Sequence, residues 1–147
     1  MSLDGEYVPS PRPHVREQVE LYERTDGAKG GTLRGLPVVI LTSRGAKSGK
    51  IRKIPLMRVE HEGAYAAVAS MGGAPTHPVW YHNLKAHPEV QLQDGANNWV
   101  MHAREVTGTE KQQWWERAVA AYPPYAEYQD RTTREIPLFV LERIQDR

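Results

Sequence analysis

The chain has 147 residues, a length typical of one domain with one hydrophobic core. Its 19 basic and 18 acidic residues leave a net charge of +1, which argues against a general nucleic-acid binder while allowing a local basic patch. The absence of cysteine excludes disulfides, thiolate nucleophiles and cysteine-ligated metal centres, and it fits a cytoplasmic protein.

The N-terminal region predicts an extended arm and not a targeting segment. Residues 1–13 are polar and proline-rich, and they lack the apolar stretch of a signal peptide. The longest apolar run, 36–41, is far shorter than the ~20 residues needed to cross a bilayer, so we expect no integral membrane span. No linker divides the rest of the chain, which predicts a single domain over residues 14–147.

A short helix and then a pair of strands are predicted after the arm. Apolar residues over 14–24 have the spacing of one helical face. A glycine-rich approach over 27–35 leads to a β-branched strand over 38–42, and the return strand is expected over 51–59. Pro55 lacks the N–H that a ladder needs, so the return strand should be at a sheet edge or carry a bulge.

Positive charge is concentrated around the turn between these two strands. The segment 44–58 has no acid and six cations: Arg44, Lys47, Lys50, Arg52, Lys53 and Arg58. Glycine turns expose backbone N–H groups, and lysine and arginine add charge-assisted hydrogen bonds. The segment is therefore either a binding site for an anion or a solvated basic hairpin. It departs from a nucleotide-hydrolase loop, because three residues and not four separate its glycines and Ile51 follows the lysine.

The middle of the chain predicts a strand of small residues followed by a short helix. The strand over 64–70 is mostly alanine, which fits close approach of a flat ligand or tight packing of a helix. Gly72 and Gly73 end this strand, and a helix capped by Thr76 should run to about Ala86.

Two further strands, a helix and a last strand are predicted in the C-terminal half. Strands over 90–92 and 99–106 flank an Asp-Gly turn at 94–95. A capping-box pattern at 107–110 begins the next helix, and the final strand is expected over 136–143. Because the strands follow one another as hairpins, we expect a mainly antiparallel sheet with flanking helices, an α+β fold in which the sheet could close into a barrel.

Several common site patterns are missing. The chain has neither the glycine fingerprint of a Rossmann site nor the serine elbow of a hydrolase. His77, His82 and His87 recur every five residues, a spacing that separates them around a helix, so we expect no metal site.

Three tyrosines form a pattern of their own. Tyr122, Tyr125 and Tyr128 line one side of the segment if it is helical. A phenol offers an aromatic face and a proton that it can donate. Packing of an amphipathic helix is the alternative explanation for such a stripe.

Taken in order, eight segments resemble the deazaflavin-dependent nitroreductase family, whose members use coenzyme F420. Each motif is weak by itself, but the ordered set from about residue 4 to residue 142 is specific. The matching segments are 35–42 (GLPVVILT), 44–52 (RGAKSGKIR), 55–56 (PL), 69–75 (ASMGGAP), 77–84 (HPVWYHNL), 86–90 (AHPEV), 122–128 (YPPYAEY) and 134–137 (REIP).

The resemblance implies the split β-barrel fold of FMN-binding-like reductases, in agreement with the antiparallel pattern. It also implies that the basic loop, through Lys47 and Arg52 above all, holds the phosphate and oligoglutamate tail of the cofactor. The glycine turn would meet the deazaflavin ring through backbone amides, and two residues of the following helix would lie along the cofactor. The implied cofactor-binding residues are Arg44, Lys47, Ser48, Gly49, Arg52, Ser70, Met71, Gly72, Gly73, Trp80 and Asn83.

The implied activity is transfer of a hydride from reduced deazaflavin to an activated small molecule, such as an enone, an unsaturated lactone, a quinone or a nitroaromatic compound. Tyr122, Tyr125 and Tyr128 would shape the substrate pocket, and one of them could donate a proton. Barrels of this type often pair, so a homodimer is possible. Two features depart from the family pattern: Met71 stands where lysine is frequent, and Arg12 and His14 replace aromatic residues of the arm.

Three other functions stay open from the sequence. An FMN-binding oxidoreductase of the same fold would need fewer cations than this loop offers, because FMN has one phosphate and no glutamate tail. A carrier could hold the deazaflavin without catalysis. A small nucleic-acid-binding barrel could use the basic hairpin and exposed aromatic residues, although the near-neutral net charge disfavours it.

Overall fold

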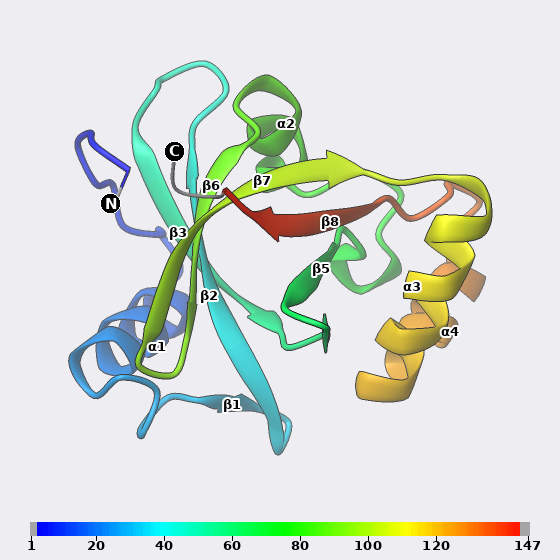
Figure 1. Ribbon diagram of the computed structural model, residues 1–147, viewed down its shortest axis with the longest axis horizontal. Coiled ribbons are helices and arrows are strands. Elements are labelled where there is room, and N and C mark those ends of the chain that lie inside the picture. The colour runs from blue at the N-terminus through cyan, green and yellow to red at the C-terminus, as the bar shows by residue number, and fades with distance from the viewer. Residues whose placement is uncertain (1–2, 145–147) are drawn as a thin grey trace.

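The computed structural model describes residues 3–144, which form a curled antiparallel sheet with helices around it (Figure 1). Among these residues the sheet has eight strands in the order β1-β2-β6-β7-β8-β5-β4, and β3 pairs with β2 outside this path. The strands are β1 (Thr32–Leu33), β2 (Leu36–Arg44), β3 (Ile51–Met57), β4 (Glu60–His61), β5 (Ala64–Val68), β6 (Glu89–Asp94), β7 (Asn97–Glu105) and β8 (Leu138–Arg143).

Four α-helices and one 3-10 turn complete the described chain. They are α1 (Pro13–Arg24), η1 (Met71–Gly73), α2 (Val79–Ala86), α3 (Gly108–Ala121) and α4 (Pro124–Asp130). In Figure 1, α3 and α4 lie together on one flank of the sheet, and α1 lies on the opposite flank. The predicted α+β class is confirmed, because every named strand pair is antiparallel. The two-residue strands β1 and β4 were not predicted, since two residues show no alternation.

Strand β2 is apolar from Leu36 to Leu41, and both faces of this part of the strand are covered. Val38 and Ile40 pack with Val19 of α1, whereas Val39 and Leu41 belong to the core inside the curled sheet. Successive side chains of a strand point to opposite faces, so one continuous apolar run serves two separate clusters.

The small residues of β5 are explained by packing. Ala66 lies in the same buried cluster as Trp114 and Ala118 of α3, and Ala67 is in the core on the other face of the sheet. Neither alanine is more than 4% exposed. This supports helix packing over the approach of a flat ligand for these two positions.

Strand β3 is at an edge of the sheet, as Pro55 predicts, because among the described strands it pairs with β2 alone. The N-terminal arm covers the beginning of this edge. Ile51 donates its N–H to the carbonyl of Glu6 at 2.8 Å, and Val8 donates to the carbonyl of Ile51 at 2.9 Å. The arm is therefore held along β3 by backbone hydrogen bonds.

One predicted helix cap and one predicted helix start need correction. Helix α3 does begin after Thr107, but no side-chain cap forms, because the Glu110 carboxylate instead accepts two hydrogen bonds from Arg104, at 2.7 and 3.0 Å. Helix α2 begins at Val79, three residues after the predicted cap. Local sequence signals indicated both helices, and at α3 a contact with Arg104 replaced the predicted cap. Over residues 3–144, no helix combines the length and the apolar character needed to cross a membrane.

Candidate functional site

The loop between β2 and β3 is closed at its base and fastened to α2. Gly45 donates its N–H to the Lys50 carbonyl at 2.7 Å. The Lys50 N–H in turn donates to the Ser48 hydroxyl at 3.1 Å. Ala46 donates its N–H to Asn83 Oδ1 at 2.9 Å, and Asn83 is only 4% exposed. The buried asparagine of α2 thus fixes the basic loop through the backbone.

The six cations of this segment differ in what they contact. Three are ion-paired with acids from other parts of the chain: Lys50 with Glu6, Lys53 with Glu23 and Arg58 with Asp94. Arg44 donates from Nη1 to the carbonyl of Gly49 at 3.1 Å. For Lys47 and Arg52, residues 3–144 provide no acidic partner. Arg44 has no acidic partner in these residues either, but it already donates within the loop. Lys47, which is exposed, and Arg52, which is half-buried, are therefore the cations most available to an external anion.

The turn at η1 has an unusual backbone. Met71, Gly72 and Gly73 all have positive φ, at 46°, 64° and 82°. A Cβ at Gly73 would lie 2.6 Å from the carbonyl oxygen of Tyr128, so this position requires glycine and the turn packs directly on α4. A Cβ at Gly72 would meet nothing within 4 Å, which leaves this residue open to a ligand.

Arg134, which precedes β8, holds this turn from one side. Its guanidinium donates to the carbonyls of Ala74, Ala69 and Ser70 at 2.8, 3.1 and 2.7 Å. In a trans peptide the C=O and the next N–H point in opposite directions, and no cis peptide occurs in the described residues. The N–H groups of Ser70 and Met71 therefore point away from Arg134.

Arg134 also orders a histidine. Its Nη1 lies 3.0 Å from His77 Nδ1, which accepts the hydrogen bond when that nitrogen is unprotonated. Burial, and then the charge of Arg134, lower the pKa of His77. Burial also lowers the pKa of Arg134. The sequence assigned Arg134 no role, because a single arginine before a strand has no distinguishing spacing; its place in the REIP segment was the only signal.

The three tyrosines lie together, but they do not line a single helix as the stripe pattern assumed, because α3 ends at Ala121 and α4 begins at Pro124. Tyr122 follows α3, while Tyr125 and Tyr128 lie on α4. The hydroxyl oxygens of Tyr122 and Tyr128 are 2.8 Å apart, and the ring centroids of Tyr122 and Tyr125 are 4.9 Å apart. Arg34, in the β1–β2 turn, approaches the Tyr128 hydroxyl to 3.5 Å with Nη1. Sequence reasoning did not select Arg34.

The three tyrosines differ in how deeply their side chains are buried. Tyr122 and Tyr125 belong to the apolar cluster beneath α3 and are 4% and 5% exposed, so both also serve packing. Burial raises the pKa of each of them. Tyr128 is half-buried and packs at the margin of the same cluster.

Trp80 lies on the same helix as Asn83. Its ring is half-buried, with its centroid 6.2 Å from that of Phe139 in β8. The indole thus rests on the core and keeps part of its surface free for a ligand.

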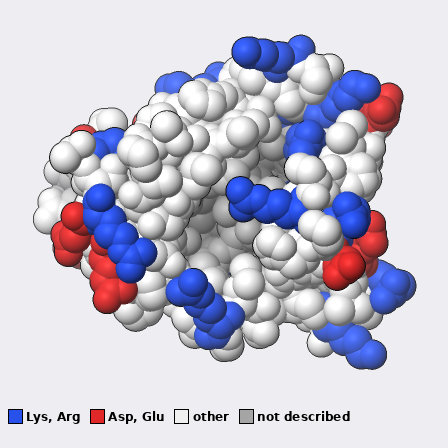
Figure 2. Space-filling model, turned by 180° about the vertical axis from the view of Figure 1, so that it is seen from behind, with Lys and Arg blue, Asp and Glu red and all other residues white. Residues whose placement is uncertain are grey.

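The face opposite to that of Figure 1 is hollowed at its centre (Figure 2). Lysine and arginine side chains project on several sides of this hollow, and acidic side chains lie toward the edges of the view. Such a distribution favours an anionic ligand, because cations around a concave surface focus the positive potential.

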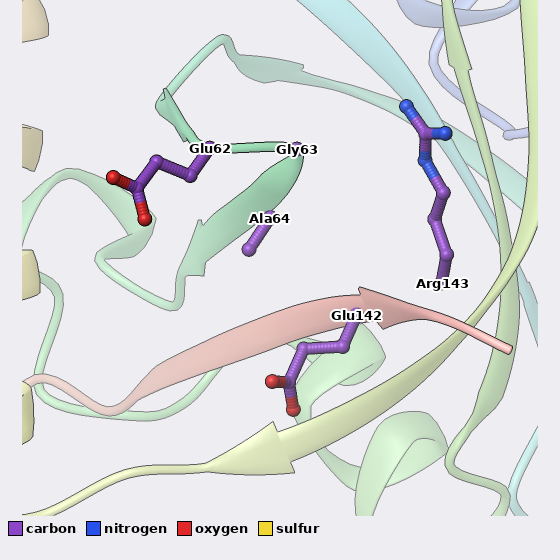
Figure 3. Close-up of a pocket in the computed structure, with 5 residues that line it drawn as sticks. All are labelled: Glu62, Gly63, Ala64, Glu142 and Arg143. Atoms are coloured by element: carbon purple, nitrogen blue, oxygen red, sulfur yellow. The ribbon is translucent and has the colours of Figure 1, made fainter. Parts of the chain in front are cut away.

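Two other surface hollows lie outside the candidate residues. One, of about 380 Å³, is bordered by Glu62, Gly63, Ala64, Glu142 and Arg143. Figure 3 shows that its two glutamates and Arg143 point in different directions and do not converge on one point. A second, of about 330 Å³, lies between α3 and α4 near Trp115. In the part of the chain that is described, no three metal-ligating side chains come close enough to hold an ion.

Several known proteins that are similar to this chain are described as F420H(2)-dependent reductases. A family model described as F420H(2)-dependent quinone reductase matches residues 14–143. An F420H(2)-dependent quinone reductase of Mycobacterium tuberculosis is 35% identical over 127 residues, covering 84% of this chain and 85% of that protein. The solved structure of an F420-H2 dependent reductase (FDR-A) has 57% identity and a TM-score of 0.69, covering 72% of this chain and 94% of that chain.

Two further structures extend the comparison. One, described as a domain-swapped dimer, is 51% identical with a TM-score of 0.72, covering 90% of this chain and all of that chain (100%). The haem storage protein HutZ of Vibrio cholerae has 12% identity and a TM-score of 0.58, covering 88% of this chain and 89% of that chain, and shows a shared fold alone. The predicted split-barrel type of fold agrees with these similarities.

Proposed function

The chain belongs to the F420H(2)-dependent quinone reductase family, and we propose that it transfers a hydride from reduced coenzyme F420 to an electrophilic small molecule. The observation that carries the proposal is the family match over residues 14–143 combined with two cations, Lys47 and Arg52, that lack an acidic partner in residues 3–144. Quinones are the acceptors named for the relatives. Enones, unsaturated lactones and nitroaromatic compounds are further candidates.

The basic loop fits the anionic end of this cofactor. A phosphate followed by an oligoglutamate tail is a polyanion of some length, and it needs more than one cation. Lys47 is exposed, so its flexible chain can follow a mobile carboxylate, while the half-buried Arg52 offers the planar fork that binds phosphate or carboxylate. Arg44, Ser48 and Gly49 shape the loop between them.

The glycine turn fits the deazaflavin ring. The ring presents carbonyl oxygens and ring nitrogens, which hydrogen-bond to backbone amides. The hydrogen bonds from Arg134 to the Ala69 and Ser70 carbonyls support this assignment, because they direct the N–H groups of Ser70 and Met71 away from Arg134. The space at Gly72 lets a flat ring approach the backbone closely. Contact through the backbone also explains why methionine is acceptable at position 71.

When bound, the reduced cofactor supplies the hydride, which is the chemically demanding part of the reaction. The residues of the chain orient both reactants and provide a proton. Trp80 and Asn83 would lie along the cofactor, and Tyr122, Tyr125 and Tyr128 would border the acceptor. A tyrosine hydroxyl can protonate the oxyanion left by hydride addition. No step in this scheme needs a nucleophile.

Side-by-side titration of the purified protein with oxidised F420 and FMN tests the proposal. We expect F420 to bind more tightly, with an affinity that falls as salt is added, and we expect turnover of the reduced form with at least one quinone, enone or nitroarene. Tight binding of FMN with no binding of F420 would refute the proposal. Binding of F420 without turnover of any acceptor would favour the carrier.

The oligomeric state and the cellular location are less closely defined than the activity. We propose a homodimer because a chain with 51% identity is described as a domain-swapped dimer. Light scattering at several protein concentrations tests this, and a mass of one chain throughout would exclude it. A cytoplasmic location stays a prediction from the absence of cysteine.

A further inference from the structure

Arg34 stands in a backbone conformation that arginine rarely adopts. The register of β1 with β2 pairs Leu33 with Leu36, so Arg34 and Gly35 alone form the turn. Their φ angles are +52° and +77°, as a two-residue turn of type I′ requires. Asparagine or glycine is favoured at the first of these positions. Glu62 before Gly63 adopts the same conformation, so the turn by itself assigns no role to Arg34 and only fixes where its side chain leaves the sheet.

The side chain of Arg34 reaches a tyrosine that lies 94 positions away in the sequence. Its Nη1 is 3.5 Å from the Tyr128 hydroxyl oxygen. The same oxygen is 2.8 Å from the hydroxyl of Tyr122. The first distance is at the outer limit of a hydrogen bond, and contacts of this kind often shorten only when the reactants are bound.

Tyr128 connects this cation to the turn that we assign to the cofactor ring. The backbone of Tyr128 is in contact with Gly73, where an added Cβ would lie 2.6 Å from its carbonyl oxygen. A second cation, Arg131, lies 5.4 Å from the centroid of the Tyr128 ring. The groups that face this phenol are therefore Arg34, Arg131, Tyr122 and Tyr125, two cations and two neutral phenols.

We propose that Tyr128 is the proton donor of the reduction and that Arg34 is a positioning residue that prepares it, an inference that rests on the proposed function. A phenol oxygen has two lone pairs and one proton. If Arg34 and Tyr122 both donate to the Tyr128 oxygen, both lone pairs are occupied and its own O–H is turned outward. The same two donors then stabilise the phenolate that remains after the proton has left.

The step balances in atoms and charge. Addition of the hydride that bound reduced cofactor would supply brings two electrons and one hydrogen nucleus to the acceptor, and it would leave an anionic oxygen there. The O–H bond of Tyr128 breaks, and a new O–H bond forms on that acceptor oxygen. The Tyr128 phenolate then regains its proton from water.

Tyr122, the buried neighbour of Tyr128, is suited to donate a hydrogen bond to the Tyr128 oxygen. Burial, followed by its hydrogen bond to Tyr128, raises the pKa of Tyr122, so Tyr122 keeps its proton. Tyr125 is buried against Trp115 and Tyr122. Of the three, Tyr128 has the most exposed side chain, and its oxygen lies 3.5 Å from Nη1 of Arg34, whose charge also acts to lower the pKa of Tyr122.

A titration of the cofactor-free protein tests the coupling directly. The ultraviolet absorbance of phenolate is followed against pH in the unmodified protein and in Tyr128→Phe, and the difference reports the hydrogen-bonded pair of Tyr122 and Tyr128. Arg34→Asn removes the charge while placing a favoured residue in the turn, so the fold is retained. Because the Arg34 charge acts to lower the pKa of Tyr122, the hydrogen-bonded neighbour of Tyr128, we expect this variant to raise the midpoint of the Tyr122–Tyr128 pair. Arg34→Lys should restore at least half of the shift, and Lys29→Asn, which removes an exposed charge from another loop, should leave it unchanged.

Steady-state kinetics with reduced F420 and a quinone test the assignment of the donor. We expect Tyr128→Phe to lower kcat about 100-fold, and Arg34→Asn about 3- to 10-fold, with the dissociation constant of oxidised F420 changed less than about twofold. In the Tyr128→Phe background, Arg34→Asn should cause no further loss, because its effect passes through the hydroxyl.

Two results would overturn the inference: an unchanged midpoint of the Tyr122–Tyr128 pair in Arg34→Asn, or full turnover in Tyr128→Phe alongside loss in Tyr122→Phe or Tyr125→Phe. Failure of the proposed function has a different signature, namely an unmodified protein that neither binds F420 nor turns it over. In that case the cofactor-free titration still upholds or overturns the coupling of Arg34 to Tyr128.

Discussion

Asn83 accepts a hydrogen bond from the N–H of Ala46 at 2.9 Å, and this contact joins a buried position of α2 to the basic β2–β3 loop. We expect Asn83→Ala to lower the free energy of unfolding by about 1–2 kcal/mol, because the Ala46 N–H loses its acceptor. Asn83→Asp keeps an acceptor but adds negative charge beside the loop. It should therefore weaken F420 binding more than it weakens the fold.

Urea unfolding and F420 titration of the two Asn83 variants separate these effects. The control is Asn97→Ala, a change at an exposed residue of β7 that should alter neither quantity. If Asn83→Asp binds F420 as tightly as the unmodified protein, the loop beside Asn83 does not hold the anionic tail.

Lys47 and Arg52 are expected to contribute to F420 binding individually. Replacing either by alanine should weaken the affinity by roughly ten- to a hundredfold, which corresponds to about 1.5–3 kcal/mol for a lost charged contact. Lys50→Ala is the matched control, because Lys50 is already paired with Glu6 at 3.2 Å and should matter less. Calorimetric titration at two salt concentrations measures all three. Equal affinities for all variants would remove both residues from the site.

Arg134 is expected to set the conformation of the glycine turn. Arg134→Lys keeps the positive charge but loses the fork that reaches the carbonyls of Ala69, Ser70 and Ala74. We expect faster amide hydrogen exchange over residues 70–74 and weaker F420 binding. Arg24→Lys, at an exposed helix end, is the control. Unchanged exchange in Arg134→Lys would show that the turn holds its shape without the guanidinium.

His77 is expected to make stability depend on pH. Burial and the nearby Arg134 charge lower its pKa in the folded protein below the ordinary value of 6.5. The unfolded chain therefore binds more protons in this range, so the free energy of unfolding is greatest above pH 6.5 and declines as the pH falls through the interval between the two pKa values. His77→Gln should flatten this decline.

Urea unfolding at several pH values from about 5 to 8 measures the slope that His77 contributes. His102→Gln, a change at an exposed residue of β7, is the matched control and should keep the full slope. An identical slope in the His77 variant would mean that other groups cause the pH dependence.

The sequence predicted strands and helices correctly where an apolar run or a repeating pattern extended over several residues. The run in β2 and the proline of β3 predicted a buried strand beside an edge strand, and both are found. The predicted capping box at Thr107 does not form, because Arg104 on the preceding strand donates hydrogen bonds to the Glu110 carboxylate. Competition of this kind between a local cap and a neighbouring strand cannot be read from spacing.

The candidate site also combines features that the sequence predicts with contacts that only the tertiary structure reveals. The sequence by itself determined the antiparallel class, the cluster of cations and the tyrosine stripe, because each depends on residue type and short spacing. Only the tertiary structure decided which cations are neutralised, since Glu6, Glu23 and Asp94 come from distant parts of the chain. It also brought Arg134 to the glycine turn and Arg34 to Tyr128, because such contacts depend on how the sheet curls and leave no periodic signal in the chain.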